Sequence, residues 1–163
     1  MPHWFNNQRV ARSISIDPIL IILDNDVIGI VCCVVFSAAS HDPTTAPIGQ
    51  TPVLQLRFHS GDLELHFCTP VCTKLIMVES NHMWLTYFTR KSFLKILKDI
   101  GNEGSNCIRM EASIVEVEGL DVKSCGYHWV FNEDLQEFNL RTMQAEIHLL
   151  GTTSFLAIED EAQ

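Results

Sequence analysis

The sequence predicts an all-β fold, an antiparallel two-sheet sandwich of the jelly-roll or Ig-like kind, with one short amphipathic helix inserted between strands. About seven short segments alternate apolar and polar residues, as half-buried strands do. Clusters of Gly, Pro, Asn and Asp separate these segments. The chain has 163 residues, of which 47% are hydrophobic and 19% charged, so it is long and apolar enough for one domain with its own core.

The first part of the chain contains the predicted central strand. Ser13–Asp17 is a first short strand, and Val27–Phe36 is a continuous apolar run rich in β-branched residues with turn residues on both sides. Such a run is typical of a strand in the middle of a sandwich. Cys32 and Cys33 lie inside this run and are predicted to be buried, because cysteine then acts as a small hydrophobe.

A β-hairpin is predicted next. Leu54, Leu56 and Phe58 alternate with polar residues, and the segment from Leu63 to Phe67 does the same. Between them His59–Asp62, with the sequence His-Ser-Gly-Asp, has the length and composition of a hairpin turn.

The later strands are predicted from the same alternation. Met83–Phe88 is one strand, and Cys125–Phe131 is another. Between them the apolar phase that starts at Ile108 and runs to Ile114 switches at Val115, which predicts a β-bulge at that point. The sandwich core is predicted to contain Trp4, Val31, Val34, Phe36, Trp84 and Trp129.

Two segments favour helices. Phe93, Ile96, Leu97 and Ile100 share one helical face, with Ser92 as the expected N-cap and Gly101 as the stop. After the predicted sandwich domain of residues 1–134, a C-terminal extension of residues 135–163 begins with capping-box spacing and a weaker helical pattern. It ends in a predicted solvated acidic tail at Glu159–Glu161.

Charge and composition exclude several classes of function. The net charge of −9 argues against nucleic acid and favours a basic partner. The longest apolar run is too short to span a membrane, and acidic residues before it argue against a signal peptide. We therefore expect a protein of the cytoplasm or the nucleus whose six cysteines are free thiols.

No catalytic, cofactor or metal site is predicted. Cys68 and Cys72 have a spacing that zinc can use, but no second pair matches it. Cys125 and His128 would point to opposite faces of a strand, so they do not form a nucleophile and its base. The chain also lacks a Gly-rich phosphate loop, and we expect a protein that is not an enzyme.

Partner contacts are predicted in three segments between strands, Ser40–Pro52, His59–Asp62 and Thr89–Asn106, since loops on a rigid β framework commonly carry binding residues. A cationic helix face in the last segment would attract an acidic patch on a partner, although such a face is often only a solvated surface. The candidate contact residues are His59, Ser60, Asp62, Arg90, Lys91, Lys95 and Lys98.

Four motifs carry a resemblance to a known family. The chain opens with Pro-x-Trp-Phe-x-x-Gln at residues 2–8, and a glycine-led strand at residues 29–36 ends in Cys-Val-Val-Phe. A Ser-Asn-His-x-Trp strand follows at residues 80–84, and Lys-x-Cys-Gly follows at residues 123–126. In this order they resemble the domain that follows the leucine-rich repeats in plant TIR-type immune receptors. The signature residues, to which the resemblance gives structural roles, are Pro2, Trp4, Phe5, Gln8, Gly29, Cys33, Phe36, His82, Trp84, Cys125 and Gly126.

The resemblance covers residues 2–134 and has local departures. Ala11 replaces a usual glycine, Asn81 replaces a usual aspartate, and residues 18–23 lack a usual tryptophan. The resemblance implies a recognition module that packs on a leucine-rich-repeat domain and helps to sense pathogen effectors, here as a fragment or a truncated paralogue. The alternatives are a cytosolic carbohydrate- or lipid-binding jelly roll and a structural cap on a repeat domain.

Overall fold

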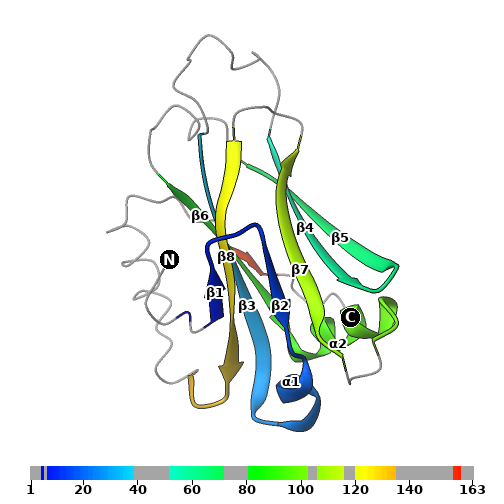
Figure 1. Ribbon diagram of the computed structural model, residues 1–163. Helices are drawn as coiled ribbons and strands as arrows, with labels where there is room; N and C mark the ends of the chain where they lie inside the picture. The colour runs from blue at the N-terminus through cyan, green and yellow to red at the C-terminus, as the bar shows by residue number, and fades with distance from the viewer. Residues whose placement is uncertain are drawn as a thin grey trace.

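The computed structural model describes residues 5, 7–38, 52–71, 81–102, 106–115, 120–134 and 156–158. Two β-sheets pack face to face, with two helices at one end (Figure 1). This architecture confirms the predicted all-β sandwich. The elements are β1 (Asn7–Arg9), β2 (Ser13–Ile16), α1 (Ile19–Leu23), β3 (Val27–Ala38), β4 (Val53–Ser60), β5 (Leu63–Pro70), β6 (His82–Thr89), α2 (Arg90–Asp99), β7 (Ile108–Val115), β8 (Leu120–Phe131) and β9 (Leu156–Ile158).

The larger sheet has the strand order β1-β8-β3-β6-β9, and the smaller sheet has the order β2-β7-β4-β5. All pairs are antiparallel except β6 and β9, which run parallel over Leu85–Tyr87. The short strand β9 lies in a stretch where the sequence predicts no strand. The parallel pair is therefore a departure from the all-antiparallel prediction.

The position of β3 between β8 and β6 confirms the predicted central strand and explains its unbroken apolar run. Ile30, Cys32 and Val34 face the smaller sheet and belong to the main core. The alternate residues Val31, Cys33 and Val35 are also buried, in a second apolar layer on the outer face of the larger sheet. Both faces of β3 are covered, so neither face carries a polar residue from Val27 to Phe36.

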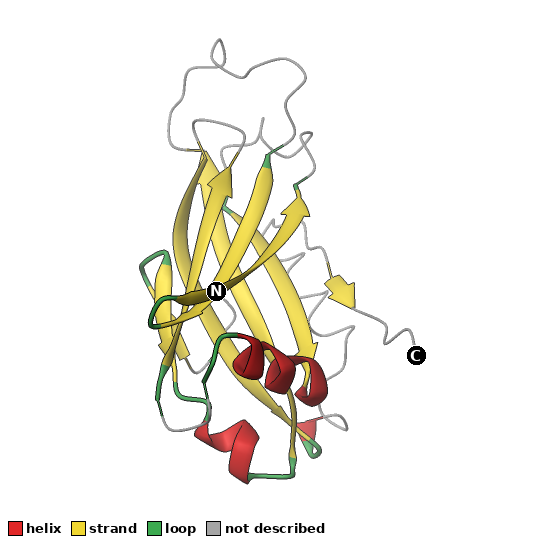
Figure 2. Ribbon diagram, turned by 90° about the vertical axis from the view of Figure 1, so that its right-hand side faces the viewer, coloured by secondary structure: helices red, strands yellow, loops and turns green. Residues whose placement is uncertain are grey.

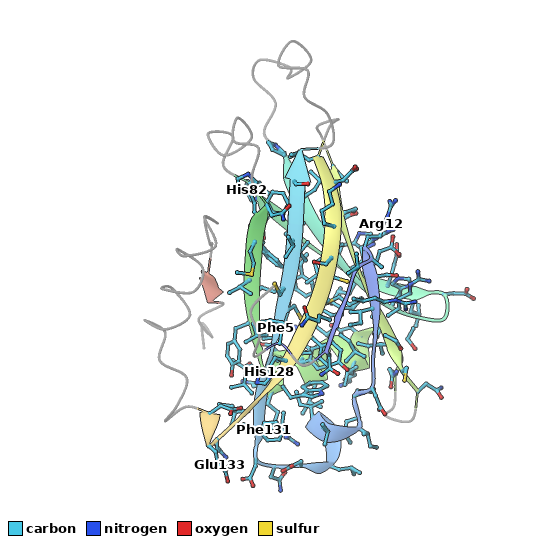
Figure 3. The ribbon with its side chains drawn as sticks, turned by 60° about the vertical axis from the view of Figure 1, so that its left-hand side comes forward. Phe5, Arg12, His82, His128, Phe131 and Glu133 are labelled. Atoms are coloured by element: carbon cyan, nitrogen blue, oxygen red, sulfur yellow. The ribbon has the colours of Figure 1, made fainter. Side chains whose placement is uncertain are left out.

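The core predictions hold for every residue that the structure describes. Val34, Phe36, Trp84 and Trp129 are buried between the sheets. Val31 is buried too, but in the outer layer, which also contains Phe5. Figure 3 shows Phe5 close to His128. Trp4 lies outside the described residues, as do residues 39–51, 135–155 and 159–163, which include the predicted C-terminal helix and the acidic tail. The domain boundary at residue 134 remains a prediction.

The predicted hairpin is confirmed, with a turn at Gly61 and Asp62 between β4 and β5. Gly61 has a φ of 59°, a conformation that glycine adopts without strain. Because β5 is an edge strand, its apolar face is only partly covered: Leu65 and Phe67 pack against the core, while Leu63 is 54% exposed.

The helix α2 confirms the predicted amphipathic segment but corrects its N-cap. The Thr89 hydroxyl oxygen, not Ser92, caps the helix by accepting a hydrogen bond from the Ser92 main-chain nitrogen at 3.1 Å. At the other end Gly101 takes a φ of 69°. Its amide donates to the Lys98 carbonyl, and the next amide, of Asn102, donates to the Leu97 carbonyl, which is a Schellman motif.

The predicted bulge after Ile114 is wrong as far as the structure describes this strand. The register of β7 against β4 runs without a shift through the pair of Val115 and Val53. The irregularities lie instead between β3 and β8, at Val27/Gly29 and Val35/Phe36. The switch in apolar phase therefore does not mark an extra residue at Val115, since cross-strand hydrogen bonding continues there.

Candidate functional site

Two of the three predicted contact segments meet at one end of the sandwich. The β4–β5 turn lies beside α2, and a Cβ atom built on Gly101 would stand 3.0 Å from Leu63 Cδ1. The third segment, residues 40–52, lies mostly outside the described residues. The strand ends that flank it, Ala38 and Val53, are at the opposite end of the molecule from the helices (Figures 1 and 2).

Arg90 has a structural place at the start of α2. Its guanidinium donates through Nη1 to the carbonyls of Asp24 and Val27 at 2.6 and 2.9 Å, and through Nη2 to the Ile22 carbonyl at 3.4 Å. These contacts tie α2 to the end of α1 and to the start of β3. The sequence suggests a solvent-facing cation, but the fold uses this one internally.

The three lysines of α2 are exposed on the outer side of the helix. Lys91, Lys95 and Lys98 face solvent, while Phe93, Ile96 and Leu97 are buried against the sandwich. Lys98 lies in the last turn, where a positive charge is favoured by the helix dipole. The helix therefore presents a cationic face whose backbone is fixed by its apolar side, its two caps and Arg90.

The β4–β5 turn contributes to a second surface, an open depression of about 490 Å³. The predicted contact residues His59 and Ser60 line it, whereas the side chain of Asp62 is exposed in the turn. The sequence did not single out the other polar lining residues, which come from β1, β2 and β7: Arg9, Ser13, Ser15 and Arg109. We call this surface the Arg9–Arg109 depression.

Strand pairing brings these residues together. Ser15 stands opposite Arg109 across β2 and β7, and Arg109 stands opposite His59 across β7 and β4. All three are in the outward phase of their strands, which the sequence pattern shows. The order β2-β7-β4, which makes them neighbours, cannot be read from the pattern, and for that reason the depression was missed.

The acidic side chains on this sheet face have basic partners. Glu111 forms a salt bridge with Arg57, and its other oxygen lies 3.6 Å from His59 Nε2. On β5, Glu64 Oε1 lies 2.7 Å from His66 Nε2, and this hydrogen bond lowers the pKa of the Glu64 carboxyl. The two carboxylates are therefore engaged beside the depression rather than inside it.

Within the described residues no group of three His, Cys, Asp or Glu side chains could hold a metal ion. Cys125 and His128 point to opposite faces of β8, as predicted: Cys125 lies in the main core, and His128 packs near Phe5 on the outer face. Burial raises the pKa of the Cys125 thiol to about 11, which disfavours the thiolate that a nucleophile requires.

The signature residues that the structure describes hold the fold together. Gly29 allows β6 to approach β3, since a Cβ there would stand 2.5 Å from the Phe88 carbonyl oxygen. The Phe36 and His82 rings pack at a centroid distance of 5.5 Å. Gln8 Nε2 donates to the Phe5 carbonyl at 3.1 Å. Cys33, Trp84, Cys125 and Gly126 are buried, and Pro2 and Trp4 lie outside the described residues.

Both helices of the described part, with five and ten residues, are much too short to cross a bilayer. Searches of curated proteins and of solved structures gave no significant match. The family model of the C-JID domain matches residues 1–136, which contain both surfaces described above.

Proposed function

Because this chain belongs to the C-JID domain family, the C-terminal domain of TIR-type plant immune receptors, we propose that it is a non-catalytic module that binds a protein partner. A receptor-associated recognition module is the function that the family supports. The finer proposal is that the partner is a pathogen effector or the leucine-rich-repeat domain of a receptor, and that binding takes place in the cytoplasm or the nucleus.

The observation that carries this proposal is the exposed cationic face of α2, held rigidly at one end of the sandwich. Lys95 and Lys98 are exposed on a helix whose apolar side is buried and whose ends are both capped. A rigid framework lowers the entropy lost on binding, and local positive charge on an acidic molecule directs acidic partners to that place.

The test compares two double variants of the full chain with the same change in net charge. Lys95→Glu/Lys98→Glu reverses the helix face, and Arg12→Glu/Lys123→Glu reverses two exposed cations elsewhere. Binding to a candidate effector and to a leucine-rich-repeat domain is measured at two salt concentrations. We expect the helix variant to bind at least about tenfold more weakly and with a smaller salt dependence, and the control variant to change less than about twofold.

Thermal unfolding first establishes that both variants fold. If both variants lose affinity equally, the effect is one of overall charge, and the assignment of the helix face is wrong. If a strand-face substitution abolishes binding while the helix variant binds normally, recognition uses a sheet surface instead.

A further inference from the structure

The described residues that line the Arg9–Arg109 depression supply many hydrogen-bond donors and no acid. Within the part of the chain that the structure describes, its charged and hydroxyl-bearing lining consists of two arginines, one histidine and three serines, without an Asp or Glu. The Arg109 guanidinium donates to the Ser13 hydroxyl at 2.9 Å, which holds its planar group at the edge of the depression. Arg9 is exposed.

Arg9 and Arg109 differ in their partners from Arg57, which lies on the same sheet face as Arg109. Arg57 forms a salt bridge with Glu111, so its charge is compensated within the fold. Among the described residues no carboxylate forms an ion pair with Arg9 or Arg109. Glu111 and Glu64, the acids on the neighbouring strands, already have partners in Arg57 and His66. The positive charge of Arg9 and Arg109 is therefore not compensated by any acid that the structure describes.

Uncompensated guanidinium groups beside hydroxyls fit carboxylates. A guanidinium presents paired N–H donors that match the two oxygens of a carboxylate, and serine hydroxyls can donate to the remaining lone pairs. A volume of about 490 Å³ holds a few side chains rather than a whole domain face. We infer that this depression binds a carboxylate-bearing segment of a protein partner, with Arg9 and Arg109 pairing with its acidic side chains.

The charge of the whole chain favours a protein segment over a nucleic acid. With a net charge of −9, the molecule repels a uniform polyanion at long range, whereas a short acidic segment on an otherwise neutral partner meets only the local positive charge. The inference rests on the proposed function and adds the chemistry of the partner. It also places recognition on both sides of the β4–β5 turn, which lines the depression through His59 to Gly61 and contacts the end of α2 through Leu63.

The test uses the full chain and a fluorescein-labelled glutamate peptide, in which two adjacent glutamates stand in the middle of a neutral Gly-Ser sequence, with binding read by fluorescence anisotropy. The variant Arg9→Gln/Arg109→Gln removes the two cations, and Arg12→Gln/Lys123→Gln removes two exposed cations that do not line the depression. We expect the first variant to bind the peptide at least about tenfold more weakly, and the second to change less than about twofold. A peptide of eight lysines should not bind at this site.

A second pair of variants keeps the test decisive if the first variant unfolds. Ser15→Glu places a negative charge in the depression on an exposed strand position, and Ser15→Gln is its uncharged match. Only the glutamate variant should weaken binding. Equal weakening by both double variants, or no binding of the glutamate peptide at all, would overturn the inference.

Two further outcomes separate this inference from the proposed function. If a single-stranded oligonucleotide binds more tightly than the glutamate peptide and depends on the same two arginines, the site is one for nucleic acid and the inference fails. If the glutamate peptide does not bind but a receptor or effector partner does so through Lys95 and Lys98, the proposed function stands without this site.

Discussion

Gly29 sets the distance between the central strand β3 and its neighbour β6 in the larger sheet. A Cβ at this position would stand 2.5 Å from the Phe88 carbonyl oxygen and from Cε2 and Oη of Tyr87. The Tyr87 hydroxyl fills this space and donates to the Ile28 carbonyl at 3.1 Å. The glycine is therefore required by the close contact between main chains, and not only by the neighbouring ring.

We expect Gly29→Ala to destabilise the protein by about 1–3 kcal/mol, because overpacking moves main chain that has little freedom to move. Urea unfolding measures the change, with Gly61→Asn as the control, since the Gly61 turn is open and asparagine tolerates its positive φ. Shortening Tyr87 in the Gly29→Ala variant should not restore stability, as the Phe88 carbonyl still blocks the Cβ. Full restoration would contradict this account.

Trp84 is the largest side chain at the interface of β6 with the main core, and it is 4% exposed. We expect Trp84→Ala to lower the free energy of unfolding by about 3–5 kcal/mol through the loss of buried area and the cavity left behind. Val10→Ala, at a side chain that is 92% exposed, should change it by less than about 0.5 kcal/mol. An unchanged melting temperature of the Trp84→Ala variant would show that the ring is not part of the core.

At the scale of elements, Arg90 adds polar contacts between two helices and a strand whose apolar residues share the main core. Its three carbonyl acceptors belong to the end of α1 and to the segment that leads into β3. Removing the guanidinium leaves these partly buried carbonyls without a charged donor, so we expect Arg90→Ala to cost about 1.5–3 kcal/mol. Arg90→Lys should recover only part of this, because an ammonium cannot reach three acceptors in one plane.

The matched control for Arg90 is Lys95→Ala, which removes an exposed cation of the same helix. Chemical denaturation measures the free energy of unfolding of Arg90→Ala, Arg90→Lys and Lys95→Ala. If Lys95→Ala and Arg90→Ala are equally stable, the carbonyl contacts of Arg90 contribute nothing and its charge is available to a partner, as the sequence alone suggests.

The elements that could be predicted from the sequence are those whose secondary structure is set by local residue pattern rather than by contacts with distant parts of the chain. The β4–β5 hairpin has strict alternation and a turn with the required glycine, and α2 has a spaced apolar face. The five-residue helix α1 has the sequence Ile-Leu-Ile-Ile-Leu, which shows neither the alternation of a strand nor the spaced apolar face of a helix. Only Ile21 in it is fully buried. The short strands β1 and β9 have three residues each and exist through pairing with distant partners.

The candidate site also has one part that local pattern predicts and one part that depends on tertiary structure. The lysines of α2 are found from one helical stretch, since their exposure depends on local periodicity. Arg9 and Arg109 are a hundred residues apart in the chain and become neighbours only when β1, β2 and β7 have been assembled. Side-chain direction can be predicted from alternation, whereas strand order requires the tertiary structure.

At the scale of the whole molecule, the two sheets differ in how they meet their surroundings. The central strand of the larger sheet, β3, is buried on both faces, whereas the smaller sheet has an outer face of arginine, histidine, glutamate and serine. The smaller sheet thus combines a structural inner face with an outer face whose residues do not hold the core. Substitutions of the polar residues that line the depression can alter binding without removing buried apolar area.

A pH dependence of stability follows from His128 on the outer face of the larger sheet. Burial lowers its pKa from the ordinary value of 6.5, against the opposing effect of Asp134, whose Oδ2 lies 3.9 Å from Nε2. The unfolded chain then binds the proton more readily than the folded one. The contribution of His128 is present above pH 6.5 and is lost as the pH falls through the lowered pKa.

We expect the melting temperature to fall between pH 7.5 and 5.5, and to fall less in His128→Gln than in the unchanged protein. His66→Gln, at an exposed position on β5, should keep the full decrease. Identical curves for the unchanged protein and His128→Gln would show that the burial of this histidine is not linked to folding.

The pairing of β1 with β8 fixes the order in which the newly made chain can fold. Arg9 stands opposite Cys125, so the first strand waits for its neighbour while more than a hundred further residues are added, roughly 5–25 s at about 5–20 residues per second. In the same interval β3, apolar on both faces, has β6 but not β8 beside it. The nascent chain therefore exposes an apolar, partly assembled sheet until the last long strand is made, and we expect chaperones that cover such a surface to raise its yield in the cell.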